Sequence, residues 1–253
     1  MSVWPACGCV PMGRVLRHFN RVDSKRIYNT FVHKEAVFRI CCSCYEAVTL
    51  EIIRQRKILE EYIHRHPEFR DSLEPVQLLA HPPESACRMA QAARRTGTGP
   101  MAAVAGAMAQ LAAEAGLKAG AEEAIVDNGG DIYLRTVKPV IIGLYAGGSA
   151  AVNRLAFEIQ PEDTPLAICS SSGLMGHSMS LGRCDLATIA ARDAALADAA
   201  ATLAANLVRT EADVEPALQR VMSIEGIDGV LIVKNSRIGL AGKLPPLTKR
   251  AGL

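Results

Sequence analysis

The sequence predicts an α+β fold in which a largely antiparallel sheet packs with helices rich in small residues. Apolar, strand-like runs are joined by turns of hairpin length, among them Asn128-Gly129-Gly130 and Asn235-Ser236, and such turns favour antiparallel pairing. Helical and strand-like segments alternate without the regular βαβ order of a parallel sheet. We expect one domain over residues 26–242, a loose N-terminal segment over 1–25 and a C-terminal tail over 243–253.

The first part of the domain is expected to open with a hairpin and to continue with a helix. Arg26 to Val32 and Ala36 to Thr49 have the composition of two strands. From Leu50 to His64 the apolar positions recur with helical spacing, and Pro67 marks the end of that helix. Three prolines then make the stretch from Asp71 to Ser85 a connection.

Two alanine-rich helices are expected in the second part of the domain. The first opens with a proline in its first turn, at Gly99-Pro100, and runs to about Ala115. The second is capped by Asp193 and runs from Ala194 to about Val208. A further helix is expected near Pro216 to Met222. The remaining segments are expected to be strands, at 124–127, 131–136, 140–145, 154–159, 167–170, 185–191, 229–234 and 237–241.

Length and composition indicate a soluble globular protein. The chain has 253 residues, of which 49% are hydrophobic and 21% charged, enough to bury a core of its own. No apolar run approaches the roughly 18–20 residues that a membrane-spanning helix needs. The N-terminus lacks the charged leader and apolar segment of a signal peptide. We therefore expect a cytoplasmic protein with no membrane partner.

Charge and cysteine content point to neither nucleic-acid binding nor a metal cluster. The formal net charge of +2 is mild, and aromatic side chains that could stack on bases are few. The basic residues that gather before residue 70 are interpreted as a solvated face. Cys41-Cys42-Ser43-Cys44 lies in a strand-like run, where reduced cysteine packs as a small hydrophobe. A zinc or iron–sulfur site would need about four converging ligands, and no second close cysteine pair follows at that spacing.

The turn at residues 127–131 allows two interpretations. Gly129 and Gly130 accept positive φ and carry no Cβ, so that backbone N–H groups can line a concavity for a phosphate-bearing ligand. Asn128 and Asp131 would then flank that ligand, with Asp131 as an acceptor or a metal ligand. Asn-Gly between two apolar runs is equally a strong signal for a plain hairpin turn. The turn alone does not decide between the two.

A carboxylate and a hydroxyl share one face of the second alanine-rich helix. Asp198 and Thr202 are four residues apart, so their oxygens lie close together on the helix. Mg²⁺ takes one or two such protein oxygens and completes its coordination with water and substrate phosphate. The alternative is structural: Asn206 continues the line, and the three residues would then form the solvent-facing stripe of an amphipathic helix.

The segment from Ser170 to Ser178 resembles a ligand-binding loop more than a turn. His177 could bind a phosphate as imidazolium or act as a general acid or base, because its unperturbed pKa is near roughly 6.5. No Gly-x-Ser-x-Gly elbow marks a serine hydrolase, and neither glycine pattern of common nucleotide sites occurs at a strand-to-helix junction. The candidate ligand-binding residues of this segment are Ser171, Ser172, Gly173, Gly176 and Ser178.

The order of four motifs along the chain is more specific than any one motif. The motifs are Gly99-Pro100-Met101-Ala102-Ala103-Val104-Ala105-Gly106, Asn128-Gly129-Gly130-Asp131, Ser170-Ser171-Ser172-Gly173 with Gly176-His177-Ser178, and Leu196-Ala197-Asp198-Ala199-Ala200-Ala201-Thr202. In this order they resemble an uncharacterised protein family related to the ApbE flavin transferases, and the likeness covers roughly residues 26 to 242.

This resemblance implies an ApbE-like fold whose glycine turn and serine–histidine loop border a flavin-nucleotide cleft. ApbE enzymes split FAD, release AMP and attach FMN to a protein threonine. By the resemblance, Asp198 and Thr202 hold Mg²⁺ at the diphosphate, and the cofactors are Mg²⁺ with FAD or FMN. His177 would lie near the flavin or the phosphate, and Asp131 would orient ligand or solvent. Members of the family are also associated with sulfide assimilation and homocysteine formation, which implies a protein partner in sulfur metabolism.

Departures from the family pattern leave the activity open. After Ser178 the chain continues from Met179 to Cys184 without the Asp-Pro-Arg-Thr-Gly-like segment of flavin transferases, and it lacks their export signal. At a strand position where Glu-Thr-Asp-Leu is expected, it has Glu46-Ala47-Val48-Thr49. A flavin transferase or FAD-cleaving enzyme is the first hypothesis. A flavin carrier without cleavage and a partner-binding protein with a degenerate site are its rivals, and alanine-rich faces leave room for a homodimer.

Overall fold

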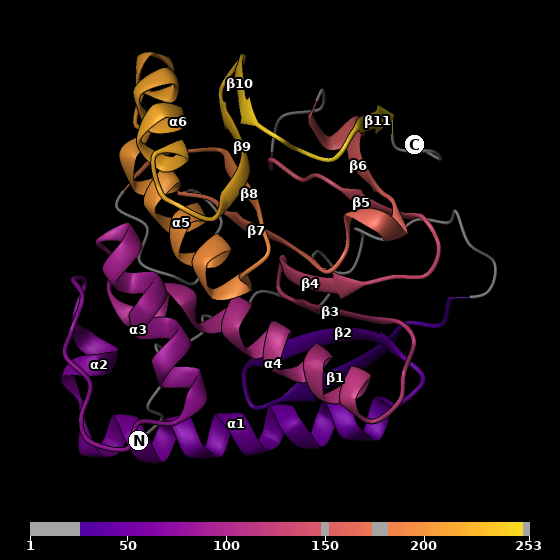
Figure 1. Ribbon diagram of the computed structural model, residues 1–253. Coiled ribbons are helices and arrows are strands. Elements are labelled where there is room, and N and C mark those ends of the chain that lie inside the picture. Colours follow the sequence, from indigo (N-terminus) through magenta and orange to yellow (C-terminus); the bar gives the residue numbers. More distant parts are fainter. Residues whose placement is uncertain (1–25, 148–151, 174–181, 250–253) are drawn as a thin grey trace.

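Antiparallel β-structure forms the centre of the molecule. The computed structural model describes residues 26–147, 152–173 and 182–249, and Figure 1 shows helices, a large sheet and a small sheet side by side. Neighbouring strands of the large sheet are all antiparallel, which confirms the predicted α+β class. In spatial order these strands are β1 (Asn29–His33), β2 (Ala36–Cys42), β3 (Ala124–Asn128), β4 (Asp131–Arg135), β7 (Leu166–Ser171), β8 (Leu186–Ala191), β9 (Ile227–Lys234) and β10 (Arg237–Gly242).

The small sheet consists of β5 (Val140–Gly143), β6 (Leu155–Ile159) and β11 (Leu247–Lys249), in the order β11-β6-β5. It packs against the large sheet through a core of mainly aliphatic side chains that also includes Phe157. The strand β11 falls within the segment that was expected to be a tail, and it pairs with β6 in antiparallel register. Residues 247–249 are therefore part of the fold.

Helices cover the other face of the large sheet. Alternation along β3 shows the two faces: Ala124 and Val126 lie in the core beneath the helices, whereas Ile125 lies in the core between the sheets. Because both faces are covered, the central strands are apolar at nearly every position. The helices are α1 (Tyr45–Arg65), α2 (Glu68–Asp71), α3 (Glu84–Thr96), α4 (Val104–Lys118), α5 (Ala194–Leu207) and α6 (Val214–Met222), with a 3₁₀ turn at Pro100–Ala103 before α4.

Small side chains let α4 and α5 approach each other closely. A Cβ on Gly106 of α4 would lie 2.1 Å from the carbonyl oxygen of Ala194 and 2.9 Å from Cβ of Asp198, both on α5. Only glycine fits there without moving one helix. The alanine content of these helices therefore serves a close crossing, and that crossing brings Asp198 to the first turn of α4.

Two sequence-based predictions of secondary structure are wrong. The strand expected over 36–49 ends at Cys42, and α1 begins at Tyr45, so Glu46-Ala47-Val48-Thr49 is helical. Val48, Thr49 and Ile52 are all buried, a spacing that lies on one face of a helix, whereas in a strand Thr49 would point to the side opposite Val48 and Ile52. The helix α3 was not expected at all; its buried Met89 and Ala92 belong to the core that α3 shares with α5.

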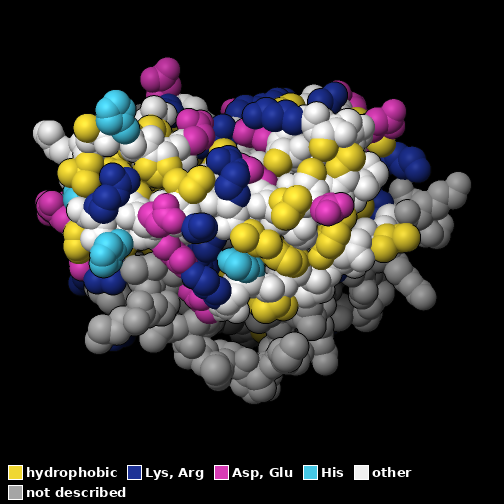
Figure 2. Space-filling view, turned by 90° about the horizontal axis from the view of Figure 1, so that it is seen from below, with side chains coloured by type: hydrophobic (Ala, Val, Ile, Leu, Met, Phe, Trp, Pro, Cys, Tyr) yellow, Lys and Arg dark blue, Asp and Glu magenta, His cyan; other side chains and the backbone are white. Residues whose placement is uncertain are grey.

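The face seen from below in Figure 2, which includes α1, carries charged side chains of both signs, interspersed with apolar ones. Lys34 pairs with Glu60 at 2.5 Å, and Arg54 pairs with Glu51 at 2.6 Å. Arg56, at 4% exposure, bridges Glu60 and Glu35. Lys34, Arg54 and Arg56 are thus held in ion pairs. In the described ranges, no helix has the length and apolar character to cross a bilayer.

Candidate functional site

A carboxylate of α5 meets the first turn of α4. Oδ2 of Asp198 accepts a hydrogen bond of 2.9 Å from the amide of Gly106. The amide of Ala105 also lowers the pKa of this carboxylate. Free amides at a helix start carry partial positive charge, which favours a carboxylate there. The close crossing of α4 and α5 therefore fixes Asp198 in place.

The β3–β4 turn reaches the same helix start. Nδ2 of Asn128, the last residue of β3, donates to the carbonyl oxygen of Ala105 at 3.2 Å. Asp131, the first residue of β4, is close enough to Asp198 for the two carboxylates to repel each other. The structure thus brings Asn128, Asp131 and Asp198 together, although they come from separate motifs.

The ionised forms of both carboxylates are electrostatically unfavourable. Burial, followed by the charges of Asp198 and Asp127, raises the pKa of Asp131 well above its usual range. Burial also raises the pKa of Asp198 to about 7, against the lowering effect of the Gly106 and Ala105 amides. No Lys or Arg side chain of the described part of the chain is among the groups that most affect the pKa of either carboxylate. A buried carboxylate pair without a cation is costly.

The available oxygens suit a hard divalent cation. Oδ1 of Asp131 is buried and has no hydrogen-bond partner within the described residues. Thr202 lies one helical turn beyond Asp198 and is buried to the same degree. Within the described ranges, no group of three His, Cys, Asp or Glu side chains could hold a metal by itself. A cation here would therefore depend on Asp198, Thr202 and oxygens from backbone, ligand or water, as Mg²⁺ commonly does.

The solvent-stripe interpretation of the α5 face is wrong. Asp198 is 8% exposed and Thr202 is 7% exposed, so neither faces solvent. Asn206, one turn further along, is only partly buried. The polar line along α5 therefore runs into the protein at its N-terminal end, toward the β3–β4 turn.

The plain hairpin interpretation of residues 127–131 is confirmed. Asn128 pairs with Asp131, and Gly129 and Gly130 form a two-residue turn with φ of 72° and 111°. The Gly130 amide donates to Oδ1 of Asp127 at 2.8 Å, so this amide already has an acceptor. A Cβ on either glycine would meet no atom within 4 Å. The turn therefore borders open space, and Gly129 and Gly130 as ligand-binding residues stay a prediction.

The serine-rich segment is described only at its start. Ser171 ends β7, and Ser172 donates through Oγ to the carbonyl oxygen of Cys184 at 3.3 Å. A Cβ on Gly173 would lie 2.5 Å from the carbonyl oxygen of Gly182, so close packing alone requires this glycine. The predicted residues Gly176, His177 and Ser178 lie outside the described residues.

Sequence reasoning missed one residue at the centre of this arrangement. Cys169 of β7 lies directly across from Asp131 of β4. Its thiol donates to the carbonyl oxygen of Ala194 at 3.6 Å, and burial together with the charge of Asp131 raises the pKa of Cys169 well above its usual range. No local pattern marks it, because the pairing depends on the register of two strands separated by a long connection. Strand alternation alone could have placed Cys169 on the helix-covered face with Ala167.

Comparison with known proteins identifies the family. A family model described as "AbpE bacteria" matches residues 32–227. The chain belongs to this family. An UPF0280 protein of Methanosarcina acetivorans is 43% identical over 205 residues, which cover 81% of each chain. An UPF0280 protein of Archaeoglobus fulgidus is 39% identical and covers 86% of this chain and 92% of its own. This membership confirms the resemblance found in the motif order.

Solved structures show that the AbpE family shares the ApbE fold. The flavinyl transferase ApbE of Pseudomonas stutzeri superposes with a TM-score of 0.58, covering 86% of this chain and 94% of its own, at 11% identity. The flavin transferase ApbE of Vibrio cholerae gives a TM-score of 0.55 with coverages of 86% and 96%, at 14% identity. At such identities the likeness concerns the fold, and the predicted ApbE-like architecture is confirmed.

Proposed function

We propose that this AbpE family member binds a flavin nucleotide together with Mg²⁺ and cleaves the diphosphate of FAD. One observation carries the proposal: Asp131 and Asp198 form a buried, mutually repelling pair. Within the described residues, no Lys or Arg side chain is among the groups that most affect their pKa values. Such a pair is offset by a divalent cation, and a diphosphate supplies the remaining oxygen ligands. The ApbE fold, shared with flavin transferases, supports flavin as the ligand class.

Each residue of the group has a role in this proposal. Asp198 and Thr202 hold the cation, and Asn128 keeps the β3–β4 turn against the start of α4. When bound, Mg²⁺ would offset phosphate charge and make the phosphorus more open to attack. Asp131, whose pKa is raised by burial, accepts the proton of the attacking hydroxyl. His177 is assigned to the flavin or phosphate by the resemblance alone.

The reaction balances with water or with a protein hydroxyl as the acceptor. A new P–O bond forms between the acceptor oxygen and the FMN phosphorus, while the bond from that phosphorus to the bridging oxygen breaks. AMP leaves with the bridging oxygen, and the acceptor proton passes to Asp131 and then to solvent. Water gives FMN and AMP, and a protein hydroxyl gives an FMN ester and AMP.

The test is release of AMP from FAD in the presence of Mg²⁺. Asp198→Asn, which keeps the volume and removes the charge, should reduce AMP release at least about a hundredfold. Asp193→Asn is the matched control on the same helix: Asp193 caps α5 by accepting from the Leu196 amide, and asparagine caps equally well. Equal activity of the wild type and Asp198→Asn would refute the proposed site.

A second candidate is a flavin carrier that does not cleave its ligand. It is favoured by the chain's continuation from Met179 to Cys184, which departs from the pattern of flavin transferases. Equilibrium dialysis with FAD separates the two. Uptake of FAD that depends on Mg²⁺ and is recovered intact, with no AMP, supports the carrier. Loss of that uptake in Thr202→Val would place the flavin at the same group of residues.

A further inference from the structure

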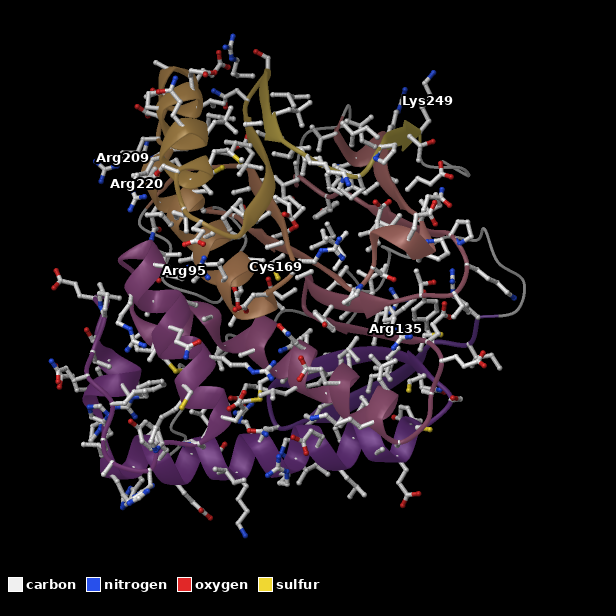
Figure 3. The ribbon with its side chains drawn as sticks, in the orientation of Figure 1. Arg95, Arg135, Cys169, Arg209, Arg220 and Lys249 are labelled. Atoms are coloured by element: carbon white, nitrogen blue, oxygen red, sulfur yellow. The ribbon has the colours of Figure 1, made fainter. Side chains whose placement is uncertain are left out.

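A glutamine of α4 holds the start of α5, one helical turn from the carboxylate of the candidate site. Oε1 of Gln110 accepts a hydrogen bond of 2.8 Å from the amide of Ala194, the first residue of α5. In Figure 3 the labelled Cys169 lies near the lower end of α5, and its thiol lies 3.6 Å from the carbonyl oxygen of the same Ala194. Gln110 has no part in the function proposed above.

Two contacts one turn apart hold α5 against α4. Gly106 and Gln110 are four residues apart and share one face of α4, as Ala194 and Asp198 share one face of α5. The first contact is the hydrogen bond of 2.9 Å from the Gly106 amide to Asp198. The second is the bond from the Ala194 amide to Gln110. One contact alone would let the first turn of α5 pivot, whereas two contacts hold it in one orientation.

The orientation of the Gln110 amide group is set by its second partner. Nε2 of Gln110 donates to Oε1 of Glu114 at 2.8 Å, which turns the oxygen of Gln110 toward the Ala194 amide. Arg88 of α3 holds Glu114 in turn through two hydrogen bonds of 3.0 and 2.9 Å. Such a bidentate pair fixes the geometry of the carboxylate. A chain of hydrogen bonds therefore runs from α3 through α4 to the first amide of α5.

Capping of α5 does not by itself require Gln110. Asp193 already caps this helix by accepting from the Leu196 amide at 3.2 Å. An amide at a helix start that no side chain caps can be satisfied by water. A side chain from a second helix does more than satisfy the amide, because it also fixes where α5 begins relative to α4.

We infer that Gln110 is a positioning residue for Asp198: it holds the first turn of α5 so that the Asp198 carboxylate meets the Gly106 amide. This inference deepens the proposed function and rests on it for its effect on Mg²⁺ and FAD. The contact between the two helices can be measured without any ligand.

The direct test is amide hydrogen exchange of the ligand-free protein, followed by NMR residue by residue. Gln110→Met keeps the length of the side chain and removes its acceptor and its donor. We expect the Gly106 amide to exchange about tenfold faster in this variant, because its bond to Asp198 is weakened, while the amides of β8 keep their rates. Unchanged exchange at Gly106 would overturn the inference. An equal rise at Gly106 and in β8 would overturn it too, because that indicates a general loss of stability.

The matched control lies on α1. Gln55 donates to Glu51, four residues away, at 2.8 Å, so Gln55→Met removes the same kind of bond within one helix. Exchange at Gly106 should keep its wild-type rate in this variant. Equal acceleration in Gln55→Met and Gln110→Met would contradict a specific role of Gln110.

An exchange of partners tests whether the hydrogen bonds, and not the volume of the side chain, are responsible. Gln110→Glu combined with Glu114→Gln keeps an acceptor for the Ala194 amide and a donor between the two positions. Exchange at Gly106 should return to near the wild-type rate in this double variant. A double variant that exchanges as fast as Gln110→Met would contradict the inference.

The Mg²⁺ requirement gives an independent measurement with ligand. In Gln110→Met, the Mg²⁺ concentration for half-maximal AMP release from FAD should rise about tenfold, with kcat at saturating Mg²⁺ nearly unchanged. A fall in kcat with an unchanged Mg²⁺ requirement would contradict the inference. If the wild type releases no AMP, the proposed cleavage fails, but hydrogen exchange still decides the role of Gln110. If Gln110→Met does not fold, Gln110→Asn, which is one methylene too short to reach both partners, replaces it in each measurement.

Discussion

The two ends of the β3–β4 hairpin carry carboxylates in opposite surroundings, partly buried at Glu123 and buried at Asp131. At one end, Glu123 precedes β3 and receives hydrogen bonds of 2.8 and 2.7 Å from Arg26 and one of 2.5 Å from the hydroxyl of Thr136. At the other end, Asp131 meets the charges of Asp198 and Asp127. The chain supplies a cation directly to Glu123, whereas no Lys or Arg of the described residues is among the groups that most affect the pKa of Asp131. We interpret the first end as a structural ion pair and propose the second as part of a ligand site.

The pKa values of the two carboxylates move in opposite directions. Burial alone would raise the pKa of Glu123, but hydrogen bonds from Arg26 and Thr136 and the charge of Arg26 bring it below its usual value. Burial and two like charges raise the pKa of Asp131. Ionisation of Glu123 therefore stabilises the fold, whereas ionisation of Asp131 without a cation destabilises it.

Removing the cation at the Glu123 end should have the largest effect. Arg26→Ala leaves the partly buried Glu123 carboxylate without its partner, and it also removes hydrogen bonds to the carbonyl oxygens of Lys138 and Pro139. We expect the free energy of unfolding, measured with urea, to fall by about 4 kcal/mol. The control is Arg70→Ala, because the pair of Arg70 with Asp71 lies at the surface. That variant should unfold like the wild type, and an equal loss in both would show that burial does not matter here.

Removing the charge at the Asp131 end should act in the opposite direction. Asp131→Asn ends the repulsion with Asp198 and lets an amide NH₂ donate toward that carboxylate. In buffer without divalent cations, we expect the free energy of unfolding to rise by about 2 kcal/mol. Addition of Mg²⁺ should then stabilise the wild type but not the variant. If the variant is less stable than the wild type without Mg²⁺, other groups of the protein already offset the repulsion between Asp131 and Asp198, and the prediction is wrong.

The contrast between the two ends shows how far sequence reasoning reaches. The strands β3, β4, β9 and β10 could be predicted, because apolar alternation and Asn-containing turns are local signals. The helix α3 and the start of α1 could not, since alanine and cysteine runs suit either structure until packing decides. Asp131 and Asp198 were predicted from a motif order shared with a family. Their direct repulsion and the place of Cys169 depend on the α4–α5 crossing and on strand register, which no local pattern encodes.

The pH dependence of stability should distinguish the two ends further. The pKa of Glu123 is lowered from 4.5 in the fold, so its ionised form adds stability above about pH 4.5, and this is lost as the pH falls through the lower folded value. We expect Glu123→Gln to cost about 1–2 kcal/mol at pH 7, and the difference from the wild type should shrink below about pH 4.5. Urea titrations between pH 7 and pH 4 measure this. A difference that grows on acidification would reverse the assigned sign.

The smallest effect is expected at the turn itself, and it separates backbone geometry from ligand approach. Gly129 has φ of 72° with open space where a Cβ would stand, so Gly129→Ala should cost about 1 kcal/mol of stability through backbone strain alone. Gly129→Asn tolerates positive φ and should cost less. If the turn only joins β3 to β4, FAD affinity in equilibrium dialysis should be unchanged in both variants. If a phosphate approaches the bare backbone, both side chains should weaken FAD binding, and the better-folded asparagine variant should be no better at binding than the alanine variant.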